Sequence, residues 1–317
     1  MFLSPQGKAM LAVVSYVLLN VGLQTGSKAL FEDGFIFPLL VLLMTLISAA
    51  LGTIIMIFVF EWEKFPVLRV LRSWKTILVL AFSIAAGTAF QYESVVRISL
   101  STNQMVKALM PVMTLVLAWI WSGELSSRGK VFSCVLLMIG IIAGVAENAE
   151  FHSIGFFFAF CSAVLHALQP IVTCILLQEE KIPPLSMALA ASIPSIIVVI
   201  PVFFFYEYHL ILSVDLDHKA RDWTTLALIS FVSLGYLLAG VFVTKYTSAI
   251  YTSVLNSIKV VLVLLVSFIV FPVHLSLANI LGLFLSIFAF CLFNYFALKE
   301  QQHPDIDLDR LPLANIV

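Results

Sequence analysis

Long apolar runs recur along the whole chain, and they limit its possible folds more than any other feature. About 20 apolar residues in a helix, rising 1.5 Å each, are enough to cross the hydrocarbon core of a bilayer. Only 11% of the 317 residues are charged, whereas a soluble domain carries about a quarter. We therefore predict an all-α integral membrane protein with about ten transmembrane helices. The predicted spans are residues 8–29, 36–60, 75–96, 99–122, 129–146, 152–177, 185–206, 224–246, 248–271 and 275–297.

The distribution of lysine and arginine predicts the orientation of these spans. An even number of spans places both termini on one side, and basic residues gather on the cytosolic side of membrane proteins. With both termini cytosolic, the cytosolic side holds Lys8, Lys64, Arg69, Arg72, Lys75, Arg128, Lys130, Lys181, Lys245, Lys299 and Arg310. The lumenal side then holds Lys28, Arg97, Lys219 and Arg221. This imbalance predicts cytosolic termini.

Two lysines, Lys107 and Lys259, stand inside apolar runs, and each follows a group of small polar residues. An ionisable residue inside a membrane span indicates a functional site. From their positions in the predicted spans, both lie about 12–17 Å deep, near the midplane. The alternative for each is a lysine that extends its ammonium group to the lipid headgroups. Because the two contexts match, we favour one cationic site shared between two halves of the chain.

The matching lysines predict an internal repeat. We divide the chain into a first five-helix repeat, residues 1–150, and a second, residues 151–300. Because each repeat has an odd number of spans, the two repeats are expected to be inverted relative to each other. An inverted repeat with a polar site at the midplane is a known transporter architecture. The acidic tail, residues 301–317, is predicted to be a disordered cytosolic segment.

Amide and hydroxyl side chains accompany the two lysines at helical spacing. These residues are Asn103, Gln104, Thr252 and Asn256. Such groups cost free energy in lipid unless they meet partners or water. Each alone could be a hydrogen bond between helices, worth about 0.6 kcal/mol. Together they favour a polar cavity around the lysines.

Two buried ammonium groups need an anion, and the chain offers few acids in its spans. Glu93 lies four residues before Arg97, so we predict a structural ion pair between them; proton coupling by Glu93 is the alternative. An anionic substrate such as a phosphate or pyrophosphate is then the natural counter-charge. Lysine binds phosphate as a point charge.

Other polar residues allow two interpretations each. Lys28, at the end of the first span, is either an entrance residue or an interfacial lysine that reaches the headgroups. Tyr236, central in the eighth span, needs a hydrogen-bond partner and either contacts a ligand or packs in the core. Two glycine spacings are suited to close helix contact, Gly22/Gly26 and Gly140/Gly144.

Several classes of function find no support in the sequence. HExxH, GxSxG and P-loop motifs and paired buried carboxylates are absent, so nothing indicates an enzyme. The four cysteines stand singly, without metal-ligand spacing, and we predict neither a metal nor a cofactor. The balance of 17 basic and 18 acidic residues argues against a nucleic-acid partner.

The motifs around these residues resemble the nucleotide-sugar and triose-phosphate transporter families of the drug/metabolite transporter superfamily. The resemblance covers essentially the whole chain. Its motifs are the hydroxyl-rich run 99–107 before a proline, Thr247, Asn256 to Lys259, Ser27-Lys28 and Phe37-Pro38. The resemblance implies an antiporter in which Lys107 and Lys259 hold the substrate's phosphate. It also implies a protein that is surrounded by membrane lipid and can form a homodimer.

Val260 departs from the pattern of the phosphate-translocating members, in which an arginine follows the second lysine. This departure favours the nucleotide-sugar branch. We therefore predict exchange of a nucleotide sugar for a nucleoside monophosphate across the Golgi or ER membrane. The alternatives are a sugar-phosphate/phosphate exchanger of the triose-phosphate type and, from another class, a non-transporting membrane scaffold or receptor.

Overall fold

The structure is a computed structural model. It describes residues 5–110, 112–113, 116–117, 128–146, 152–213, 219–246, 259–260, 262–263, 265–267, 269–271 and 277–302. The regular elements within these ranges are all helices. They are α1 (Pro5–Glu32), α2 (Pro38–Ile54), η1 (Ile55–Val59), α3 (Val67–Arg72), α4 (Trp74–Arg97), α5 (Leu100–Lys107), α7 (Arg128–Ala146), α8 (Ser153–Cys174), η2 (Ile175–Glu179), α9 (Pro184–Tyr206), α10 (Tyr208–Ser213), α11 (Lys219–Tyr246) and α13 (Leu277–Gln302).

The prediction of an all-helical membrane protein is confirmed for the described residues. Six helices are long and apolar enough to cross a bilayer. They span Met10–Glu32, Pro38–Val59, Trp74–Arg97, Ser153–Leu177, Pro184–Tyr206 and Arg221–Gly240. The predicted spans 129–146 and 275–297 coincide with α7 and α13, which are not among these six. The other two predicted spans, 99–122 and 248–271, run largely through residues outside the described ranges. The total of ten spans and the disordered tail therefore stay predictions.

Proline and serine fix the starts of three helices. Pro38 and Pro184 each occupy the first turn of a helix, α2 and α9, where the missing N–H costs nothing and the fixed φ is already helical. The predicted short connection before Leu100 is confirmed, because α4 ends at Arg97 and α5 begins only three residues later. The Ser99 hydroxyl accepts a hydrogen bond from the Thr102 amide and so caps α5.

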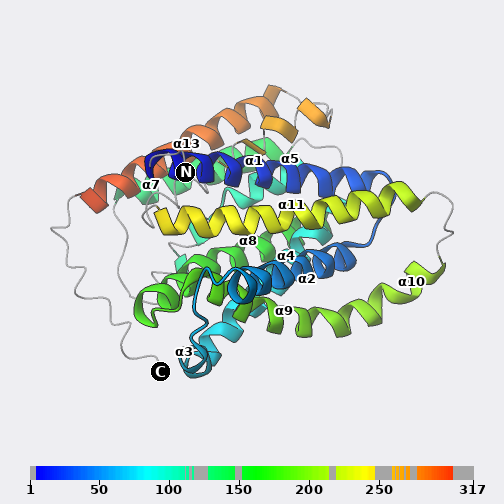
Figure 1. Cartoon of the computed structure of the whole chain (residues 1–317). Helices are drawn as coiled ribbons and strands as arrows, with labels where there is room; N and C mark the ends of the chain where they lie inside the picture. Colours follow the sequence, from blue (N-terminus) through cyan, green and yellow to red (C-terminus); the bar gives the residue numbers. More distant parts are fainter. Residues whose placement is uncertain are drawn as a thin grey trace.

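The long helices lie side by side with roughly parallel axes (Figure 1). α1 packs against α11, and α11 also packs against α2. α8 packs against α4, and α4 also packs against α9. The remaining extensive contacts are between α2 and α9 and between α7 and α13.

Two glutamates tie α2 and α9 to each other at their ends. Glu207, directly after α9, accepts hydrogen bonds from the amides of Leu39 and Leu40 in the first turn of α2, both at 2.8 Å. Glu63, after η1, accepts hydrogen bonds from the Ser186 amide at 2.7 Å and the Ser186 hydroxyl at 2.5 Å, in the first turn of α9. The first amides of a helix have no acceptor within that helix. Each carboxylate therefore supplies an acceptor for amides at the start of the other helix. The two helices therefore run antiparallel.

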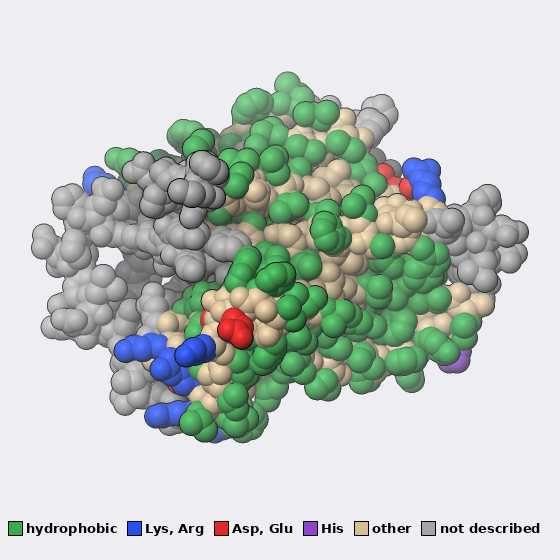
Figure 2. All heavy atoms as spheres, in the orientation of Figure 1, with side chains coloured by type: hydrophobic (Ala, Val, Ile, Leu, Met, Phe, Trp, Pro, Cys, Tyr) green, Lys and Arg blue, Asp and Glu red, His purple; other side chains and the backbone are tan. Residues whose placement is uncertain are grey.

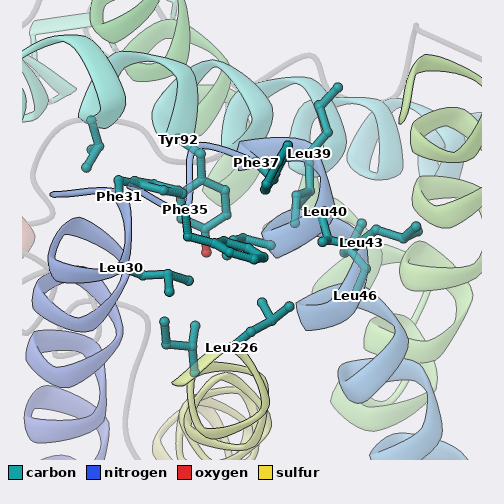
Figure 3. Packing of buried hydrophobic residues seen from close by; sticks show 14 of the residues in the cluster. Leu30, Phe31, Phe35, Phe37, Leu39, Leu40, Leu43, Leu46, Tyr92 and Leu226 are labelled. Atoms are coloured by element: carbon teal, nitrogen blue, oxygen red, sulfur yellow. The ribbon is translucent and has the colours of Figure 1, made fainter. Parts of the chain in front are cut away.

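A large apolar cluster closes the end of the bundle where α2 begins. Figure 3 shows its residues converging from the end of α1, the following connection, α2, α4 and α11. The rings of Phe31 and Tyr92 meet edge to face, with 5.9 Å between their centroids. This packing holds α1 against α4 close to Lys28.

The outer surface has the character of a lipid-facing surface. Figure 2 shows apolar side chains spread over most of the visible described surface, with lysine and arginine gathered around α3 at one end. Large apolar side chains such as Phe231 and Ile269 are strongly exposed. Exposed apolar area on this scale marks contact with a membrane or a partner rather than with water.

Candidate functional site

Lys259 is buried against two tyrosines from different helices. Its ammonium group donates hydrogen bonds to the hydroxyls of Tyr16, on α1, and Tyr236, on α11, both at 2.8 Å. The two rings are stacked, with centroids 4.9 Å apart. The ammonium nitrogen lies 4.2 Å from the Tyr16 ring centroid and 5.0 Å from that of Tyr236. Hydrogen bonds and cation–π attraction therefore replace the water that the charge has lost.

Lys107, at the end of α5, lies close enough to Lys259 for the two positive charges to repel each other. Both side chains are only 8% exposed. Among the described residues, the Lys107 ammonium group has neither a hydrogen-bond nor an ion-pair partner. Two buried like charges without a carboxylate attract an anion strongly, because the surroundings screen them poorly.

The other polar residues of α5 divide into two kinds. Asn103 is fully buried and donates to the Ser94 hydroxyl at 3.0 Å, so it holds α5 to α4. Gln104 is also buried, and its side-chain nitrogen has no hydrogen-bond partner among the described residues. An amide donor left in this way is suited to a ligand. The predicted site residues Thr252 and Asn256 lie outside the described residues.

A polar stripe on α1 extends the site. Its members are Tyr16, Asn20, Gln24 and Lys28. They are spaced by four residues and therefore share one face of the helix. Asn20 lies near the Tyr236 hydroxyl, and Gln24 accepts a hydrogen bond from Gln91 of α4 at 2.7 Å.

Of this stripe, only Lys28 was predicted from the sequence as a site residue. The spacing of four residues between its members could have indicated the others, but single polar residues in an apolar helix are common and do not stand out.

Lys28 is buried within the protein rather than extended away from it, with 7% of its surface exposed. Its ammonium group donates to the carbonyl oxygens of Val95 at 2.9 Å and Ile98 at 3.1 Å. It also pairs with Glu32 at 3.5 Å. Carbonyl groups at the end of a helix lack donors within the helix. Lys28 supplies a donor to these carbonyl groups at the end of α4.

The predicted ion pair between Glu93 and Arg97 is confirmed. The Arg97 guanidinium also lies over the Phe158 ring, 5.3 Å from its centroid. The expected hydrogen-bond partners of Tyr236 are present as well, in Lys259 and Tyr16.

Residues 8–294 match the Triose-phosphate Transporter family. The chain belongs to this family. The resemblance inferred from the motifs is thereby confirmed. The Triose-phosphate Transporter family consists of transporters rather than enzymes, and the protein is accordingly a multi-pass membrane protein of a transporter family.

Relatives within the Triose-phosphate Transporter family carry two kinds of name. A probable sugar phosphate/phosphate translocator of Arabidopsis thaliana is 23% identical, over 89% of this chain and 93% of its own. The UDP-galactose transporter 1 of the same plant is 25% identical, over 97% and 96%. One solved crystal structure shares the fold with a TM-score of 0.61 at 14% identity, covering 92% of this chain and 98% of the other.

Proposed function

We propose that the protein is an antiporter that exchanges a nucleotide sugar for a nucleoside monophosphate across the Golgi or ER membrane. The observation that carries this proposal is the pair of buried lysines, Lys107 and Lys259, whose charges no carboxylate of the described residues neutralises. A phosphate or pyrophosphate group would supply the missing negative charge.

The same pair of lysines gives a physical reason for exchange. A loaded site is nearly neutral, whereas an empty site holds two buried positive charges that repel each other. Moving the empty site through the closed state costs more free energy than moving the loaded one. The empty carrier would therefore change its orientation only after it binds a second substrate on the opposite side of the membrane. Such obligatory exchange is antiport.

The environment of Val260 favours the nucleotide-sugar assignment. This side chain packs against the apolar cluster of Met105, Ala108 and Leu137. It therefore adds no donor beside Lys259, where a guanidinium would hold a terminal phosphate with two hydrogen bonds. A nucleotide sugar would recover that binding energy through its uncharged groups, held by side chains such as Gln104 and Tyr236.

The helix packing supports the proposed inverted repeat of residues 1–150 and 151–300. If α1, α2, α4 and α7 correspond to α8, α9, α11 and α13, each of the six most extensive pairings has a counterpart. The pair α1–α11 corresponds to α4–α8, and α2–α11 corresponds to α4–α9. The pairs α2–α9 and α7–α13 correspond to themselves.

Single hydrogen bonds follow the same correspondence. Ser48 of α2 donates to the Ser230 carbonyl of α11, and Ser195 of α9 donates to the Ala81 carbonyl of α4, both at 2.9 Å.

Counterflow in proteoliposomes tests the function. Vesicles loaded with a nucleoside monophosphate should take up a matching nucleotide sugar, and external nucleoside monophosphate should inhibit that uptake strongly. Inorganic phosphate and triose phosphates at equal concentration should barely compete.

The opposite order of inhibition would move the assignment to a sugar-phosphate/phosphate exchanger, the activity named for several relatives. Absence of exchange with every phosphorylated substrate would favour the scaffold or receptor alternative.

A further inference from the structure

A pair of glutamine side chains joins α1 to α4 inside the bundle. The Gln91 side-chain nitrogen donates to the Gln24 side-chain oxygen at 2.7 Å. Gln91 is buried, with 4% of its surface exposed. Gln24 lies eight residues beyond Tyr16 on the same face of α1, about 12 Å along the helix axis. Asn20 lies between them, so a line of polar groups runs from the Lys259 ammonium group to the glutamine pair.

This contact engages only two of the four polar groups of the two amides. A glutamine side chain carries one acceptor oxygen and one donor NH₂ group. The bond occupies an N–H of Gln91 and the oxygen of Gln24. Within the described part of the chain, neither amide has another partner. The Gln24 NH₂ and the Gln91 oxygen thus remain as a donor and an acceptor, and neither is among the fully buried unpartnered atoms, so both can be reached by a polar ligand.

Three other polar contacts between the long helices are of a different kind. Ser48, Ser195 and Gln169 each donate to a backbone carbonyl of a neighbouring helix. Those bonds end on groups that are fixed in the helix backbone. Both partners in the glutamine pair are side chains with free torsions, so they can release each other when a ligand offers better partners.

We propose that Gln24 and Gln91 form a subsite for the uncharged half of the substrate, while Lys107 and Lys259 hold its phosphate. This proposal rests on the proposed function. The ligand chemistry is a donor beside an acceptor, which the edge of a nucleobase and the hydroxyl groups of a sugar both provide. The two amides then select among phosphorylated compounds, and the lysines require that the substrate carry a phosphate.

Ligand binding to the purified full-length protein tests this division of roles. The variants are Gln24→Met and Gln91→Met, which keep side-chain length and remove the polar groups. The probes are inorganic pyrophosphate, uridine monophosphate, glucose 1-phosphate and UDP-glucose. We expect each variant to bind UDP-glucose about ten-fold more weakly, as loss of one hydrogen bond implies, and to bind pyrophosphate as the wild type does.

The other two probes identify the source of the donor and acceptor. Weaker binding of uridine monophosphate, with glucose 1-phosphate unchanged, would place the base at the amides. The reverse result would place the sugar there. Gln169→Met is the matched control, because it removes a membrane glutamine that bonds the Ser83 carbonyl instead, and it should leave all four affinities unchanged.

Two results would overturn the proposal. One is unchanged UDP-glucose binding in both variants; the other is an equal loss of pyrophosphate binding, which would mean that the amides act only through the lysines. If a methionine variant does not fold, Gln91→Asn, which keeps the polarity and withdraws it by one methylene, supplies the same comparison. Failure of the wild type to bind any of the four probes, or GDP-mannose and CMP-sialic acid in their place, would contradict the proposed function itself.

Discussion

At the scale of single residues, the two lysines of the site are held differently. Lys259 is surrounded by the hydroxyls and ring faces of Tyr16 and Tyr236, whereas Lys107 meets no such partner among the described residues. The charge of Lys107 is therefore retained at a cost to folding. A charge that weakens the fold indicates a role in binding rather than in stability.

Replacement of either lysine separates these effects. Lys107→Ala should abolish exchange in proteoliposomes and leave the melting temperature in detergent equal to or above that of the wild type, because it removes an uncompensated charge. Lys259→Ala should also abolish exchange. Arginine at either position should impair transport as well, since its planar fork differs from a compact ammonium group. Lys75→Ala, at an exposed lysine, is the control, and normal exchange in both alanine variants would refute the cationic site.

The sequence predicted the residues with the strongest chemical signature and missed those whose role depends on contact. Lys107 and Lys259 stand out because charges are rare in apolar runs. Tyr16 and Gln24 became visible only when folding brought them to Lys259 and Gln91, 243 and 67 residues away in the chain. Hydropathy registers such residues as minor interruptions, so their role could not be read from composition.

At the scale of helices, the carboxylate of Glu207 controls the start of α2. Burial raises the pKa of Glu207 from 4.5 to about 7, although the amides of Leu39 and Leu40 favour its charged form. The folded protein thus holds this proton more tightly than the unfolded chain does. The resulting stabilisation is complete below pH 4.5 and is lost as the pH rises to 7.

The substitution Glu207→Gln should remove the dependence of stability on pH that this proton causes. From pH 4.5 to 7.5, the free energy of unfolding of the wild type should fall by about 3 kcal/mol relative to that of the variant. Denaturant titration in detergent at a series of pH values measures the difference. Glu179→Gln, at an exposed acid, controls for the general effect of charge removal. Parallel pH profiles for the wild type and Glu207→Gln would be inconsistent with a proton held at α2.

The contact between α7 and α13 depends on Gly140, one of the four glycines with the predicted close-contact spacing. A Cβ atom at this position would lie 2.7 Å from the backbone nitrogen of Ser286, so Gly140→Ala should destabilise the protein by about 1–3 kcal/mol. Gly26→Ala is the matched control, because its nearest neighbour is an Ile229 side-chain atom at 3.5 Å. Equal melting temperatures for the two variants would show that α7 and α13 are not tightly packed there.

At the scale of the whole molecule, the sequence predicted six of the spans well, because length and hydropathy alone define them. The predicted ranges 75–96 and 185–206 agree with α4 and α9 to within one residue at each end. The arrangement of the helices is another matter. Which helix lies beside which depends on contacts such as those of Glu63 and Glu207, and a local pattern contains no trace of a partner more than 120 residues away.

The proposed orientation follows from the basic residues and is testable directly. Epitope tags at both ends should bind antibody when only the plasma membrane is permeabilised, because both termini are expected in the cytosol. A tag in the loop between α10 and α11 should stay protected until the internal membranes are opened as well. Protection of either terminal tag would overturn the orientation and, with it, the inverted repeat.

The reciprocal glutamates also bear on how the chain is made. Leu39 leaves the ribosome 168 residues before its partner Glu207, so the start of α2 enters the membrane with its amides uncapped. Glu63 is in turn synthesised 123 residues before Ser186, whose amide will donate a hydrogen bond to it. The first half of the protein therefore remains unfinished until the second half is in place. Two halves expressed as separate chains should accumulate only when both are present in the same cell.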